Sequence, residues 1–261
     1  PSDGSGQGAT AAQSLGSSGA VALRTKVYFG IGAGGETASM WIFNALGLIF
    51  YQQILGLPAG LAGTALALAI FADAITDPLI GAVSDRFRSR FGRRHPFLFT
   101  APIPLAICVF LIFHPPQFIV ESHTLLFSWL CVFTILQRTF QTFYVVPHLA
   151  MGAELSTDYL ERTRVMAFNN LFGLYGNMIM QVLAWFVVFG FIFADQGGQL
   201  YRPAYTWVAL SACVIILISI FACAFGTRDQ IEHLKRNENI PLGKTSLRAF
   251  YVDIWSVLQN R

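Results

Sequence analysis

Residues 205–225, YTWVALSACVIILISIFACAF, carry no charged side chain. An α-helix needs about 20 mainly apolar residues to cross the hydrocarbon core of a bilayer, and this segment has that length. Segments of similar apolar character precede it at residues 27–51, 61–83, 97–113, 125–148 and 168–193. These runs lack the alternating pattern of barrel strands, and an open sheet edge in lipid would leave backbone groups unsatisfied. The sequence therefore predicts an all-α, polytopic membrane protein whose six transmembrane helices form one bundle.

The composition excludes most soluble classes of protein. Hydrophobic residues make up 54% of the chain and charged residues only 12%, with a mean hydropathy of +0.55, whereas soluble domains are about 25% charged. The net charge of +3 comes from basic residues between the apolar segments, so it predicts membrane topology and no nucleic-acid partner. The four cysteines lie inside apolar segments without paired spacing, which favours packing over disulfides or zinc. HExxH, GxSxG and Cys-His constellations are missing from the sequence, so we expect no enzyme and no cofactor.

Positive charge alternates between the connections. Basic residues are concentrated before the first segment, in the second and fourth connections, and after the sixth segment: Arg24, Lys26, Arg86, Arg88, Arg90, Arg93, Arg94, Arg162, Arg164, Arg228, Lys235 and Arg236. The first, third and fifth connections contain only Arg202. Because cytoplasmic loops are enriched in Lys and Arg, we expect a multi-pass protein of the cell membrane with both chain ends cytoplasmic.

The chain divides into three parts. Residues 1–23 are rich in Gly, Ser and Ala and predict a disordered cytoplasmic tail. Residues 24–226 hold the six-helix bundle, and residues 227–261 form a cytoplasmic central loop. Within this loop, apolar residues recur at helical spacing over 246–258 and predict an amphipathic helix. That helix either lies on the inner membrane surface or packs against the bundle. Since the sequence ends here without another apolar segment, we expect it to be part of a larger protein.

Four ionisable residues inside the apolar segments give the functional signal: Glu36, Asp73, Asp77 and Arg138. A charge at the bilayer centre costs at least about 2.5–3.5 kcal/mol and usually marks an ion or substrate path. Asp73 and Asp77 are one helical turn apart, so their ionised carboxylates repel each other unless something positive lies between them. A proton, a sodium ion or Arg138 would each serve, and sodium would also suit the hydroxyls of Thr76 and Thr142. The alternatives are a transported-cation site and a static ion pair between Arg138 and one acid.

Two motifs resemble a known family. Residues 73–97, DAITDPLIGAVSDRFRSRFGRRHPF, and residues 145–164, VVPHLAMGAELSTDYLERTR, resemble the glycoside-pentoside-hexuronide:cation symporters of the major facilitator superfamily. The resemblance covers most of residues 27–261 and implies the amino-terminal half of a twelve-helix transporter. It implies cation-coupled secondary transport of a sugar or glycoside by alternating access, driven by sodium or protons. The implied partners are this substrate, the lipid bilayer and a C-terminal six-helix half.

The resemblance also assigns roles to single residues. It implies that Asp73 and Asp77 bind the cation, that Thr142 is a hydroxyl ligand, and that Glu36 binds the sugar. Two positions depart from the family pattern: Val145 replaces an acid in helix 4, and Asn170 replaces an arginine in helix 5. The identity of the sugar and the choice between sodium and proton therefore stay open.

The connection after the second segment resembles the cytoplasmic motif of the superfamily, in which an acid and basic residues latch neighbouring helices. Its members here are Gly81, Asp85, Arg86, Gly92, Arg93 and Arg94, and the acids Glu154, Asp158 and Glu161 are expected partners. This pattern predicts a gate, although the arginines alone would also fix the orientation.

The candidate substrate-binding residues are Arg138 and the aromatic and amide residues of the first, fourth and fifth segments: Trp41, Asn44, Gln141, Tyr144, Asn169, Asn170, Tyr175, Asn177 and Gln181. Sugars need such mixtures of rings and hydrogen-bonding groups in a mostly apolar pocket, although helix packing uses the same residue types. One alternative function is sodium-dependent transport of a lysolipid-like or other organic solute on the same fold. Another is a non-transporting membrane receptor or scaffold.

Overall fold

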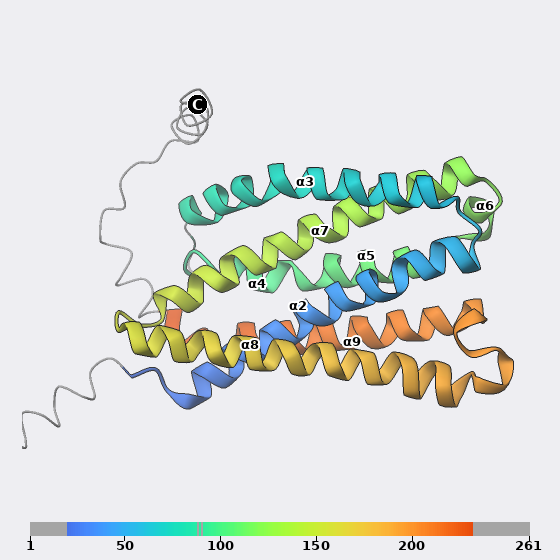
Figure 1. Cartoon of the computed structure of the whole chain (residues 1–261). Helices are drawn as coiled ribbons and strands as arrows, with labels where there is room; N and C mark the ends of the chain where they lie inside the picture. Colours follow the sequence, from blue (N-terminus) through green and yellow to red (C-terminus); the bar gives the residue numbers. More distant parts are fainter. Residues whose placement is uncertain (1–19, 88, 90, 232–261) are drawn as a thin grey trace, which may run out of the picture.

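The computed structural model describes residues 20–87, 89 and 91–231, and every regular element among them is helical (Figure 1). The predicted amphipathic helix at 246–258 and residues 1–19 of the predicted tail lie outside the described residues. The elements are α2 (Leu23–Ile49) with a π-helical extension η1 (Phe50–Ile54), α3 (Ala59–Arg86), α4 (His95–Thr100), α5 (Pro102–Phe113), α6 (Gln117–Val120), α7 (His123–Glu154), α8 (Tyr159–Val182) with a π-helical extension η2 (Leu183–Ile192), the 3-10 turns η3 (Ala194–Gln196) and η4 (Gly198–Leu200), α9 (Arg202–Gly226) and η5 (Arg228–Gln230). The prediction of an all-helical chain is confirmed for this part.

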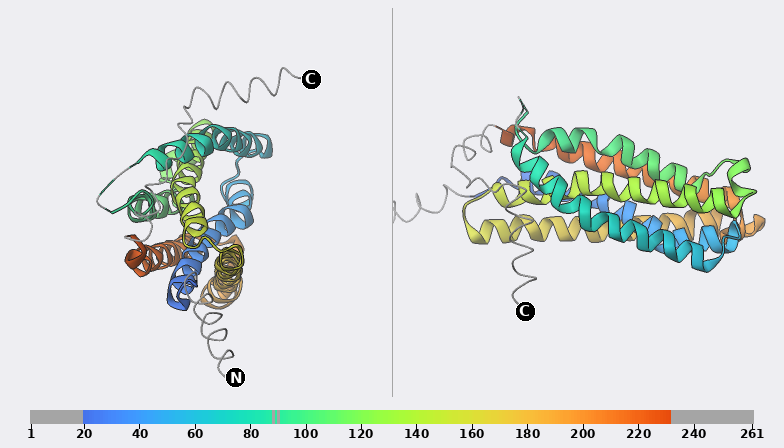
Figure 2. Two further views of the ribbon diagram at one scale, coloured as in Figure 1. Left: turned by 90° about the vertical axis from the view of Figure 1, so that its left-hand side faces the viewer. Right: turned by 90° about the horizontal axis from the view of Figure 1, so that it is seen from above.

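The long helices lie side by side in one elongated bundle, as the three views in Figures 1 and 2 show. Helix α2 packs against α8 and α9, α5 packs against α7 and α9, and α3 packs mainly against α7. Helix α3 lies at the edge of the bundle and exposes large apolar side chains such as Phe71, Ile75 and Leu79. We call the end of the bundle that carries Arg94 and Arg164 the basic end; it lies at the left of Figure 1.

Four helical segments of the described chain are long and apolar enough to span a membrane: Ala59–Arg86, His95–Phe113, Tyr159–Ile192 and Arg202–Gln230. Helices α2 and α7 are also long, with 27 and 32 residues, but they carry most of the polar residues of the site described below. The polar residues that line this site lower the hydropathy of α2 and α7. The chain is therefore an integral, multi-pass membrane protein, and the number six for its spans stays a prediction.

The glycines Gly30, Gly32, Gly34 and Gly35 of α2 allow close contact with its neighbours. A Cβ atom on Gly30 would lie 2.7 Å from a ring carbon of Phe172 on α8, and one on Gly35 would lie 3.1 Å from Ser219 Cβ on α9. Gly176 of α8 lies directly against the backbone of Gly34. Small residues at membrane helix interfaces let backbones approach in this way. These glycines therefore serve helix packing.

Candidate functional site: a polar cavity between α2, α3 and α7

A cavity of about 300 Å³ lies between α2, α3 and α7. Its walls are Glu36, Met40, Phe43 and Asn44 from α2, Asp73 and Asp77 from α3, and Gln137, Arg138, Gln141, Thr142, Val145 and Val146 from α7. The four ionisable residues that the sequence analysis singled out within the apolar segments thus all face one space. This convergence is expected because charged side chains in membrane helices turn towards a bundle interior or a water-filled cavity.

Asp73 forms an ion pair with Arg138. The Arg138 guanidinium donates from Nη1 to Asp73 Oδ2 at 2.5 Å, and the two side chains are only 22% and 24% exposed. Arg138 Nε is buried and has no hydrogen-bond partner among the described residues. The positive charge expected beside the acid pair is therefore present in the protein itself, at Asp73.

Asp77 has a different partner. The Thr142 hydroxyl donates to Asp77 Oδ1 at 2.8 Å. Asp77 follows Asp73 by four residues and Thr142 follows Arg138 by four residues, so two successive turns of α3 meet two successive turns of α7. Pro78 comes next in α3 and has no N–H to donate, which leaves the carbonyl group of Ala74 without its helical hydrogen bond. A carboxylate, a hydroxyl and a carbonyl oxygen thus occur on adjacent turns of α3 and α7, and such oxygen atoms are ligands for hard cations.

Two glutamines connect α7 to α2. Gln137 donates from Nε2 to Ser39 Oγ at 3.0 Å and to Gln141 Oε1 at 3.4 Å, and Gln141 donates to the backbone carbonyl group of Glu36 at 3.1 Å. The sequence analysis named Gln141 but missed Gln137 and Ser39. The signal for Gln137 was its place one helical turn before Gln141 in the polar stretch ILQRTFQTF at residues 135–143.

Glu36 differs from the other two acids of the cavity. Its Oε2 atom is buried and has no hydrogen-bond partner among the described residues. Its carboxyl group also forms no ion pair with any of the described residues.

A second cavity of about 430 Å³ adjoins the first. It is lined by Thr37, Met40, Trp41, Asn44, Ala45 and Asn177. Met40 and Asn44 line both cavities. Of the predicted substrate residues, Glu36, Arg138, Asn44 and Gln141 line the first cavity, and Trp41, Asn44 and Asn177 line the second.

Two predicted site residues on α3 and α7 lie away from the cavity. The Thr76 hydroxyl turns back to the Asp73 carbonyl group of its own helix at 3.5 Å. Tyr144 is fully buried and stacks on His148 with ring centroids 4.9 Å apart. Its hydroxyl group occupies the space that Gly32 leaves open by lacking a side chain.

The predicted substrate residues Asn169 and Asn170 also lie away from the cavity. They belong to α8, which packs against α2 and contributes no residue to the lining of the first cavity. Asn169 is buried and Asn170 is exposed. Neither residue lines the second cavity.

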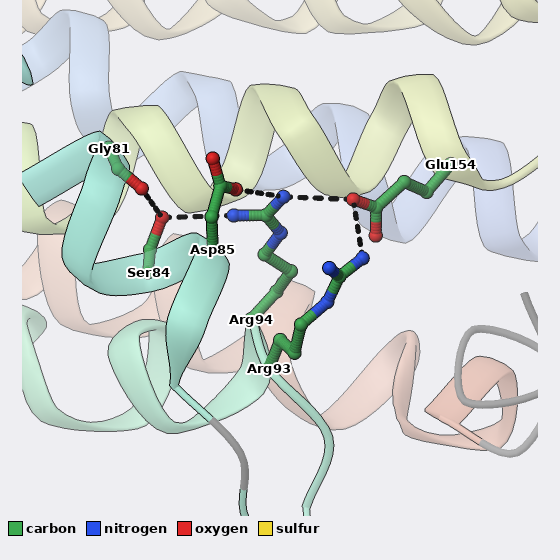
Figure 3. Close-up of polar contacts among 6 residues, drawn as sticks. All are labelled: Gly81, Ser84, Asp85, Arg93, Arg94 and Glu154. Atoms are coloured by element: carbon green, nitrogen blue, oxygen red, sulfur yellow. Dashed lines mark hydrogen bonds and ion pairs between the residues drawn. The ribbon is translucent and has the colours of Figure 1, made fainter. Parts of the chain in front are cut away.

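A second polar cluster lies at the basic end and is drawn in Figure 3. We call Ser84, Asp85, Arg93, Arg94 and Glu154 the arginine cluster. The Arg94 side chain is only 7% exposed; it donates to Ser84 Oγ at 2.9 Å and contacts Asp85 at 2.7 Å and Glu154 at 2.8 Å. Arg93 donates to the same oxygen atom of Glu154 at 3.2 Å. The arginines after α3 thus join the ends of α3 and α7, as the expected latch would require.

Two other residues predicted for the latch, Asp158 and Glu161, have different surroundings. Asp158 is the N-cap of α8 and accepts from Leu160 N at 3.3 Å. Glu161 pairs with Lys26 of α2 at 2.6 Å and with Arg164, and not with the arginines after α3. The side chains of Lys26 and Glu161 are only 11% and 5% exposed, so this buried pair joins α2 to α8. The sequence analysis missed it because it took Lys26 as a topology signal. Arg86 is the last residue of α3.

The chain is similar in sequence to known membrane transport proteins. Residues 28–259 match the family described as MFS/sugar transport protein. The chain is 29% identical to the putative glycoside/cation symporter YagG of Escherichia coli over 80% of its own length and 44% of the relative. It is 28% identical to the inner membrane symporter YicJ of E. coli, over 90% of the chain and 48% of the relative. It is 32% identical to sodium-dependent lysophosphatidylcholine symporter 1-A of Danio rerio, over 41% of the chain and 20% of the relative. The chain thus spans less than half the length of these relatives.

Proposed function

The chain belongs to the glycoside-pentoside-hexuronide:cation symporter family of the major facilitator superfamily, and on this premise we propose that it is the amino-terminal six-helix half of a cation-coupled sugar or glycoside symporter. Proteins of this family are membrane transporters and not enzymes. The proposed protein lies in the cell membrane with both ends of this chain in the cytoplasm, needs no cofactor, and works together with a second six-helix half. Alternating access then arises from rocking of the two halves about a site near the bilayer midplane.

The observation that carries the proposal is the cavity between α2, α3 and α7. It combines two carboxylates on α3, the hydroxyl of Thr142 and the amides of Gln137 and Gln141 with the apolar side chains of Met40 and Phe43. Carboxylate and hydroxyl oxygens suit a cation, and amides beside apolar groups suit a sugar. A cation bound at Asp77 and Thr142 alters the contact between α3 and α7, and this gives it the differential affinity for two conformations that coupling requires.

The relative from Danio rerio, named as a sodium-dependent lysophosphatidylcholine symporter, supports a second candidate substrate class. The large apolar side chains that α3 exposes are compatible with a lipid-like solute. The match covers a smaller part of this chain than the matches to YagG and YicJ, so we place sugar or glycoside transport first.

The proposal is tested with the complete transporter in proteoliposomes. A panel of labelled monosaccharides, glycosides and disaccharides is offered for exchange and for uptake, with an imposed sodium gradient, an imposed proton gradient or neither. We expect at least one sugar to be exchanged without a gradient and accumulated with one of the gradients. Exchange of a lysolipid but of no sugar would favour the second candidate, and exchange of neither would contradict both.

A further inference from the structure

The three acids of the cavity differ in their partners. Asp73 is neutralised by Arg138 at 2.5 Å. Asp77 accepts a hydrogen bond from Thr142 and is exposed. Glu36 has a buried carboxyl oxygen without any partner in the part of the chain that the structure describes. Glu36 as a whole is half-buried and lines the cavity, so the buried oxygen is one of its two carboxyl oxygens. A charged carboxylate oxygen that is shut off from water without a hydrogen bond or counter-ion is disfavoured, and protonation of the carboxyl group removes this cost.

The surroundings of Glu36 strengthen this argument. On α3 the cavity presents Asp73 and Asp77, which are acids, and on α7 it presents Arg138, whose Nη1 contacts Asp73. The Tyr144 hydroxyl of α7 and Cys223 of α9 meet at Gly32, one helical turn before Glu36 on α2. Helix α8 meets this part of α2 with Gly173 and Gly176. The described side chains around Glu36 thus supply no counter-ion for it.

We propose that Glu36 is a proton-binding site of the cavity, separate from the cation site at Asp77 and Thr142, and that it is protonated in the conformation described here. A proton taken from water forms the O–H bond on the carboxyl group, and it returns to water when the cavity opens and hydrates the carboxylate. While protonated, Glu36 donates a hydrogen bond into the cavity, so the substrate meets a neutral donor and not an anion. This inference depends on the proposed function only for the cavity's role in transport.

The decisive test is infrared spectroscopy of the complete transporter at neutral pH, because a carboxylic acid has a C=O stretching band that a carboxylate lacks. We expect the unmodified protein to show one band that disappears in Glu36→Gln and persists in the matched control Asp77→Asn. We also expect this band to decrease as the pH rises. If the Glu36→Gln spectrum equals that of the parent in this region, Glu36 is ionised and the inference is wrong.

A second test needs no variant. A hydrophobic carbodiimide adds to buried carboxylic acids and not to paired carboxylates, and peptide mass spectrometry locates the adduct. We expect adducts on Glu36 that become fewer as the pH rises, and none on Asp73. Adducts on Asp77 with none on Glu36 would overturn the inference. Because neither test uses a substrate, a transporter that exchanges no sugar but shows the Glu36 band would contradict the proposed function and leave the proton site standing.

Discussion

At the scale of single residues, the cavity shows how a membrane protein accommodates charge. Asp73 and Asp77 project from adjacent turns of α3, and each finds a different partner on α7. Arg138 neutralises one acid permanently, because a guanidinium does not lose its proton in a protein. Asp77 has the Thr142 hydroxyl as its partner and no counter-ion among the described residues, so in the proposed symporter it is the acid at which an exchangeable cation would bind.

The Asp73–Arg138 pair yields a prediction on stability. Asp73→Asn or Arg138→Gln alone leaves a partly buried charge without its counter-ion, so each should lower the free energy of unfolding. The double variant removes both charges and should lose less than the two single variants together, by about 0.5–3 kcal/mol. Thermal unfolding of the four proteins in detergent, followed by tryptophan fluorescence, measures this difference. Additive losses would show that the two residues do not stabilise each other.

The two acids of α3, Asp73 and Asp77, yield a prediction on transport. In the complete transporter, Asp73→Asn and Asp77→Asn should each abolish cation-driven accumulation, while at least one of them still exchanges substrate. An amide at position 77 removes the charge that would bind the cation, and a ligand shifts an equilibrium only by its differential affinity. An amide at position 73 leaves Arg138 without its counter-ion, and this guanidinium can then compete with the cation for Asp77. Uptake against a gradient and exchange without one are measured in parallel. Normal accumulation in both variants would make the acid pair structural.

The sequence predicted the ionisable residues of the cavity better than its neutral ones. Glu36, Asp73, Asp77 and Arg138 were singled out because a charge in a membrane helix is costly and usually marks an ion or substrate path, and all four line the cavity. An aromatic or amide side chain has no such constraint: Tyr144 stacks on His148 beside Gly32, and Asn169 lies on α8, which does not line the cavity. Placing these residues requires the rotation of each helix about its axis, and that is set by packing.

At the scale of helices, the interface between α2 and α8 depends on glycine. A Cβ atom on Gly176 would collide with the backbone of Gly34, whereas one on Gly63 of α3 would meet nothing within 4 Å. Gly176→Ala should therefore destabilise the protein by about 1–3 kcal/mol through overpacking. Gly63→Ala is the matched control and should be neutral or stabilising by up to about 1 kcal/mol, since Ala is the better helix former. Equal unfolding temperatures for both variants would contradict the close packing.

The arginine cluster gives a second prediction at this scale. Arg94→Met leaves Glu154 without its closer arginine contact. This change should lower the free energy of unfolding by about 3 kcal/mol, the low end of the range for breaking a buried ion pair, because Asp85 is more than half exposed. Arg24→Met is the control: Arg24 and Asp229 are 3.7 Å apart with side chains 68% and 75% exposed, and the loss should be about 1 kcal/mol or less. Chemical unfolding of both variants measures the costs. Similar costs would show that burial does not strengthen the cluster.

At the scale of the whole molecule, the distribution of charge sets the orientation in the membrane. The basic end carries Arg93 and Arg94 just before α4 and Arg162 and Arg164 in the first turns of α8, whereas Arg202 is the single basic residue in the connections that the sequence placed at the opposite side. Arg202 is held there by Gln117 Oε1 at 2.9 Å and the Pro115 carbonyl group at 3.0 Å. By the positive-inside rule, we expect the basic end to face the cytoplasm.

Orientation is tested with one cysteine at each end of α8. Thr157 lies in the α7–α8 connection and Gln196 in the α8–α9 connection, and both are exposed. Gln196 is preferable to the neighbouring Gly197, whose φ of 105° disfavours any side chain. In intact cells, a membrane-impermeant maleimide should label Gln196→Cys at once and Thr157→Cys only after the membrane is opened. The unsubstituted protein is the control, and we expect little labelling of it because Cys108 and Cys223 are buried and Cys131 and Cys213 are partly buried. The reverse pattern would place the arginine cluster outside the cell, where it could not act as a cytoplasmic latch.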